Sequence, residues 1–75
     1  MTKLERHPIG VAVYWYSDKG ECWYAEGPIG SGQVYRCNGR NSALTMAATI
    51  DHFLRTGEKR AFSVRDAQQI EENTL

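Results

Sequence analysis

The chain has 75 residues, of which 41% are hydrophobic and 24% charged, with only two prolines. This composition excludes a disordered chain, which would lack the apolar residues needed for a core. No run of residues approaches the roughly 20 apolar residues of a membrane-spanning helix. Residues 1–8 are polar where a secretory signal would be apolar, so we expect a cytoplasmic protein.

Three strands are predicted first along the chain, after a flexible N-terminal tail over residues 1–8. Residues 9–16, 21–26 and 33–37 are rich in β-branched and aromatic side chains. The segments between them, 17–20 and 27–32, contain the glycines, proline and aspartate typical of hairpin loops. The sequence therefore predicts an antiparallel β-β-β sheet.

Two helices are predicted after the strands. From Ala43 to Leu54, apolar residues are spaced to form one face of a helix. Asn41 or Ser42 is suited to cap its start, and Gly57 follows at a position where helices commonly end. Ser63 and Asp66 resemble a capping box that opens a second helix, which ends near residue 72. The expected fold is therefore α+β, as one domain over residues 1–75, with the main helix on one face of the sheet.

The strand register predicts which side chains share a face. Loops of three residues at 18–20 and six at 27–32 would place the more aliphatic side chains, with Trp15 and Trp23, beneath the main helix. The opposite face would collect Tyr14, Tyr16, Tyr24 and Tyr35, with Cys22 and Cys37 beside them. The reverse packing stays open, as does pairing of the two cysteines, because a one-residue change in register would rearrange both faces.

An exposed tyrosine face suits binding, because the side chain combines a broad apolar ring with a polar tip. We expect the four tyrosines to contact a protein partner or a second copy, because a short chain gains most from a shared core. Small proteins of this size are common among accessory or inhibitory factors of phages and mobile elements. That expectation rests on size alone.

No residue pattern indicates catalysis, a metal or a cofactor. Cys22 and Cys37 are fifteen residues apart. Neither the two cysteines nor the two histidines have the close spacing of zinc ligands. A nucleophilic cysteine would need an activating environment that no motif supplies. The loop at 27–32 leads into a strand, whereas phosphate-binding loops lead into a helix. We expect a protein that is not an enzyme.

Nucleic acid is the alternative partner. Three antiparallel strands followed by a helix, over about residues 9–57, is similar in layout to the arm-binding domains of tyrosine-family integrases, which place such a sheet in a DNA groove. The resemblance is one of topology and implies that the sheet would meet the nucleic acid. Basic side chains suited to phosphate contacts follow the main helix, namely Arg55, Lys59, Arg60 and Arg65. The net charge of zero argues against a dedicated nucleic-acid binder.

Overall fold

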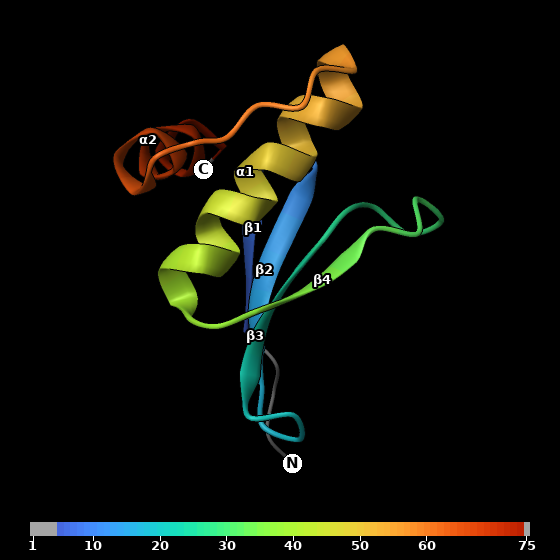
Figure 1. Ribbon diagram of the computed structural model, residues 1–75, viewed down its shortest axis with the longest axis vertical. Coiled ribbons are helices and arrows are strands. Elements are labelled where there is room, and N and C mark those ends of the chain that lie inside the picture. Colours follow the sequence, from blue (N-terminus) through green and yellow to red (C-terminus); the bar gives the residue numbers. More distant parts are fainter. Residues whose placement is uncertain (1–4, 75) are drawn as a thin grey trace.

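A four-stranded antiparallel sheet carries two helices on one side. The computed structural model describes residues 5–74 (Figure 1). The strands lie in the order β1-β2-β3-β4, each paired with the next along the chain. Their bounds are Arg6–Ile9 for β1, Ala12–Ser17 for β2, Cys22–Glu26 for β3 and Val34–Cys37 for β4; the helices are Arg40–Thr56 (α1) and Val64–Thr74 (α2). The α+β class and the two helices are confirmed, but the expectation of three strands is wrong.

The additional strand is β1, which occupies part of the predicted N-terminal tail. The tail prediction is wrong from Arg6 onward, and its first four residues lie outside the described residues. The pairing of Ile9 with Ala12 leaves Gly10 and Val11 as a two-residue turn. Gly10 has a φ of +62°, which glycine adopts without steric cost. The run predicted as one strand over residues 9–16 is therefore interrupted by a turn.

The predicted register is also wrong by one residue. Ser17 pairs with Cys22, so the first loop has four residues, and Glu21 takes a positive φ of 51°. Glu26 pairs with Val34 instead of Gln33. Because side chains alternate between the two faces of a strand, this shift moves every side chain of β3 to the other face relative to β2.

The helices begin and end largely as their caps indicate. Gly57 closes α1 in the left-handed region, with φ +79°, and its amide donates to the Phe53 carbonyl at 2.7 Å. The predicted capping by Asn41 or Ser42 is wrong, because α1 starts at Arg40 and Gly39 is its N-cap. The hydroxyl of Ser63 accepts the Asp66 amide at 3.1 Å, as expected for a cap of α2.

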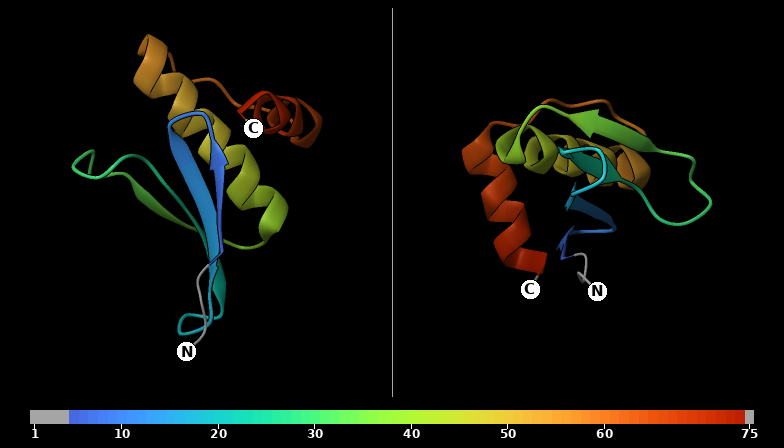
Figure 2. Two further views of the ribbon diagram at one scale, coloured as in Figure 1. Left: turned by 180° about the vertical axis from the view of Figure 1, so that it is seen from behind. Right: turned by 90° about the horizontal axis from the view of Figure 1, so that it is seen from below.

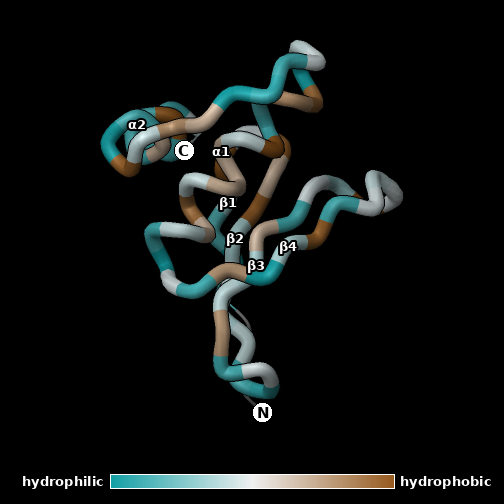
Figure 3. The backbone as a smooth tube through the Cα atoms, viewed as in Figure 1, coloured by the Kyte–Doolittle hydropathy of each residue, from teal (hydrophilic) through white to brown (hydrophobic). Residues whose placement is uncertain are grey.

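The core lies between α1, α2 and the helix-facing side of the sheet. Seen from behind, the strands lie in front of α1, and α2 lies to one side (Figure 2). Six of the twelve buried hydrophobic residues of the described chain are alanines, among them Ala43, Ala47 and Ala48 of α1. These small side chains let the helix lie close to the strands. Hydrophobic residues also lie away from this core, among them the exposed Val11 and Val34, and the backbone coloured by hydropathy shows a hydrophobic position along β4 (Figure 3).

Candidate interaction surfaces

The outer face of the sheet is the side opposite the helices. Both helices pack on the other side, where α2 lies beside β1 and also accepts a hydrogen bond from Tyr14 of β2. The register places four outer-face residues directly opposite one another across all four strands: Arg6, Trp15, Tyr24 and Arg36. We call these four residues the outer row. With neighbouring strands about 4.8 Å apart, the outer row is about 14 Å long.

Contacts within the outer row order its aromatic centre. The rings of Trp15 and Tyr24 stack with centroids 4.9 Å apart and planes at 22°. The Arg6 guanidinium lies 5.2 Å from the Trp15 ring centroid and pairs with the Glu26 carboxylate. The Trp15 indole N–H donates to the same Glu26 oxygen, Oε1, at 2.9 Å. These stacking and cation–π contacts stabilise the arrangement by about 0.5–1.5 kcal/mol each.

Apolar side chains lie next to the outer row at the turn between β1 and β2. A shallow hollow of about 280 Å³ is lined there by Val11, Val13 and the loop from Gly27 to Ile29. Val11 is 49% exposed and Ile29 is fully exposed. The outer face thus combines a stacked aromatic pair, arginines and uncovered aliphatic groups.

The four tyrosines predicted to bind a partner do not share one face. Only Tyr24 lies on the outer face, while Tyr14, Tyr16 and Tyr35 lie on the side of the helices. Tyr16 and Tyr35 remain partly exposed, at 39% and 44%. The predicted tyrosine face therefore does not form, because the shift in register separates its members.

Tyr14 is buried, and its hydroxyl donates to the Glu71 carboxylate of α2. Burial, followed by this hydrogen bond to a carboxylate, raises the pKa of Tyr14 to about 12. Its ring stacks on His7 with centroids 4.9 Å apart. The tyrosine therefore connects α2 to the sheet as a neutral hydrogen-bond donor.

The predicted phosphate-binding residues lie on exposed parts of α1, α2 and their connection. Arg55 lies 3.8 Å from Asp51, and the Arg60 guanidinium lies 5.0 Å from the Phe62 ring centroid. The fold places this group on the helix side, so it does not join the outer row. Lys59 and Arg65 are both exposed.

The two cysteines project to opposite faces, contrary to the predicted register. Cys37 pairs with Trp23 on the helix side, whereas Cys22 pairs with Ser17 on the outer face. Both thiols are free and buried, and burial raises the pKa of Cys37. Within residues 5–74, no three His, Cys, Asp or Glu side chains are grouped to hold a metal ion.

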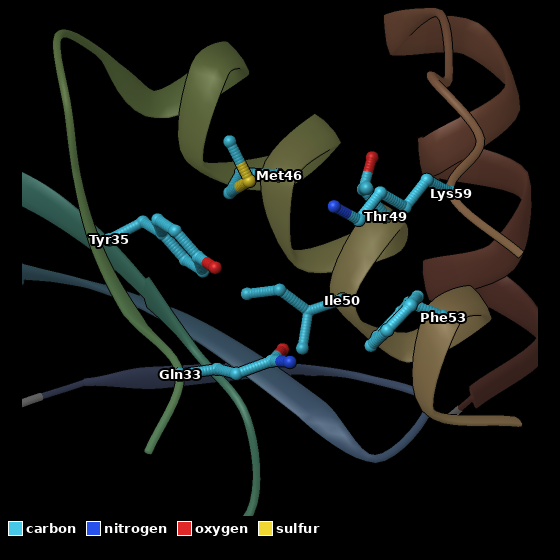
Figure 4. Close-up of a pocket in the computed structure, with 7 residues that line it drawn as sticks. All are labelled: Gln33, Tyr35, Met46, Thr49, Ile50, Phe53 and Lys59. Atoms are coloured by element: carbon cyan, nitrogen blue, oxygen red, sulfur yellow. The ribbon is translucent and has the colours of Figure 1, made fainter. Parts of the chain in front are cut away.

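A second uncovered surface lies between β4 and α1. This β4 groove has a volume of about 280 Å³ and is lined mainly by Tyr35 of β4 and by Met46, Ile50 and Phe53 of α1. Figure 4 shows the Tyr35 ring directed toward the α1 side chains, with Gln33 and Lys59 completing the lining. The groove runs beside the edge of the sheet that β4 forms.

Sequence reasoning missed Arg6, Trp15 and Arg36 as members of one surface. Arg6 falls in the predicted tail, and the predicted register directs Trp15 and Arg36 away from Tyr24. A useful signal is Gly10 inside the predicted strand over residues 9–16, since glycine within a strand often marks a turn or bulge.

No helix in the described part of the chain is long and apolar enough to cross a membrane. The chain matches no family model, no curated protein and no solved structure to which it was compared.

Proposed function

We propose that the chain is a non-enzymatic binding module that contacts a protein partner through the outer face. The observation that carries the proposal is the outer row, which places Trp15 and Tyr24 at the centre of a face that neither described helix covers. Tryptophan, tyrosine and arginine are the residue types enriched where interfaces gain most of their binding energy.

Charge favours a protein over a nucleic acid as the partner. The Arg6 guanidinium is paired with Glu26, which leaves Arg36 as the one outer-row cation without an ion pair among the described residues. Nucleic-acid interfaces are much more positively charged than protein interfaces. The exposed Val11 and Ile29 add apolar area of the kind that protein interfaces cover.

Nucleic acid is the second candidate, because the outer row carries an arginine at each end. Its length of about 14 Å is close to the width of a B-DNA major groove, about 12 Å. Binding of this kind would be weakened strongly by added salt, because phosphate contacts release counterions. The basic residues from Arg55 to Arg65 would then contribute only if the nucleic acid also reached the helix side.

Affinity capture with variants tests the proposal. Immobilised protein is exposed to an extract of the native host, before and after nuclease treatment, and the captured species are quantified. We expect a protein species that survives nuclease and is lost with Tyr24→Ala and Arg36→Ala. Gln68→Ala, on the exposed side of α2, is the matched control and should capture normally.

The alternative outcomes separate the two candidates. Capture that disappears after nuclease, together with salt-dependent binding of duplex or single-stranded oligonucleotides, would support the nucleic-acid candidate. Capture unaffected by both outer-row substitutions would show that the outer face is not the binding surface.

A further inference from the structure

The outer edge of β4 carries backbone groups that no strand within residues 5–74 pairs. The Gly27 amide donates to the Gln33 carbonyl at 2.8 Å. In an antiparallel ladder hydrogen-bonded pairs alternate, so Tyr35 and Cys37 direct their backbone groups toward β3. The amides and carbonyls of Val34 and Arg36 therefore point away from the sheet.

This edge contains neither proline nor lysine, two residues that commonly prevent strands from associating. Val34 and Tyr35 are both substantially exposed, at 56% and 44%. Figures 1 and 2 show no helix or strand along the outer side of β4. The edge is thus available to another strand.

We propose that the occupant is a second copy of this chain, joined by antiparallel pairing of β4 with β4. A two-fold axis through Tyr35 places Val34 of each copy opposite Arg36 of the other. Both residues present their backbone groups to the free edge, so this register forms four hydrogen bonds between the copies. The result is a continuous eight-stranded sheet.

Charge complementarity supports this register. Glu26 pairs across β3 and β4 with Val34, so Arg36 of the second copy would lie in the same cross-strand row, one strand beyond Val34. Glu26 uses its Oε1 for Arg6 and Trp15, and its Oε2 makes no hydrogen bond or ion pair with the described residues. Each Arg36 would therefore meet the Glu26 of the other copy. A register shifted to oppose Arg36 with Arg36 would instead place like charges together.

The β4 groove supplies an apolar surface for the same contact. Tyr35 of each copy would lie beside the other Tyr35 on the helix side, next to the walls formed by Met46, Ile50 and Phe53. The core of one chain is rich in alanine, so a shared apolar layer would compensate for its small side chains. A single self-complementary surface explains the free edge, the groove and the unpaired arginine.

Sedimentation equilibrium of the purified chain tests this inference independently of the proposed function. We expect a monomer–dimer equilibrium that Val34→Pro weakens by at least about 30-fold, because proline removes two intermolecular donors per dimer. The Val34 amide makes no bond to β3, so circular dichroism should remain that of the folded chain. Val34→Thr is the matched control: it retains the amide and should still dimerise.

A charge exchange between copies tests the register. Arg36→Glu and Glu26→Lys should each weaken self-association, since each opposes like charges at both ends of the interface. An equimolar mixture of the two should form a heterodimer, because each new charge then meets its opposite. A wild-type chain that stays monomeric, a Val34→Pro variant that still dimerises, or a mixture that does not associate would each overturn the inference.

Discussion

The two edges of the sheet differ in how fully the rest of the chain protects them. β1 contains Pro8, which has no amide to offer another strand, and α2 packs beside it. Both helices make hydrogen bonds to the turn after β1. Asp51 of α1 accepts a hydrogen bond from the Val11 amide at 2.9 Å, and Thr74 of α2 accepts one from the Gly10 amide at 2.7 Å. In the described part of the chain, β4 contacts α1 but contains no proline and receives no side-chain hydrogen bond from either helix. The same sheet thus has one edge built for stability and another available for association.

The largest expected loss of stability comes from a substitution in the turn after β1, at the protected edge of the sheet. In Gly10→Ala the new Cβ would lie 2.1 Å from the Asp51 Oδ1, at a positive φ that side chains disfavour. We expect the free energy of unfolding to fall by about 3 kcal/mol or more, measured by urea denaturation. Gly32→Ala is the control, because Gly32 also has a positive φ but nothing within 4 Å. It should cost only about 1 kcal/mol.

A smaller loss of stability is expected when the two edges are compared by placing threonine in β1 and in β4. Ile9 of β1 is fully buried, so Ile9→Thr loses apolar contacts and buries a hydroxyl, at a cost of about 2–3 kcal/mol. Val34→Thr on β4 should change the stability of the monomer by less than about 0.5 kcal/mol. Denaturant unfolding at protein concentrations that keep the chain monomeric measures both. Equal losses at the two positions would contradict the contrast between the edges.

The smallest effect concerns the contact between α2 and the sheet. Tyr14→Phe removes the hydroxyl that donates a hydrogen bond to Glu71. We expect the free energy of unfolding to fall by about 1–2 kcal/mol. The pKa of Tyr14 rises from its ordinary 10.0 to about 12 in the folded chain. The unfolded chain therefore loses this proton first as the pH rises, so the contribution is complete below pH 10 and disappears toward pH 12.

The pH dependence has its own control. Unfolding measured across this alkaline range should show a steeper loss of stability for the wild type than for Tyr14→Phe, which has no proton to release at this position. Parallel curves for the two proteins would show that Tyr14 titrates as it does in the unfolded chain.

The sequence indicated the elements better than their pairing. The helices carry local signals, such as Gly57 after α1 and Ser63 before α2, that report their ends directly. The first strand has a local signal only at its end, in Gly10, because Arg6 and Pro8 resemble a polar tail and the start of β1 is recognisable only by its contacts with β2 and α2. Turn length decided the register, and nothing local predicts that Glu21 adopts a positive φ.

The candidate surfaces followed the register and could not be predicted without it. A one-residue slip exchanges the faces of a strand, so the predicted register puts Tyr24 beside Tyr14, whereas the structure pairs it with Trp15. The apolar stripe of α1 shows a similar limit. Ala48 and Asp51 are buried while Leu54 is 40% exposed, because the packed face is set by contact with the sheet and with the turn after β1.

The chain has two tryptophans, one on each side of the sheet. Trp15 belongs to the outer row, and Trp23 packs against the core beside Tyr14. Intrinsic fluorescence can therefore observe the two sides separately. With Trp23→Phe, emission would follow events at the solvent-facing indole and its stacked neighbour; with Trp15→Phe, it would follow the loosening of the interior.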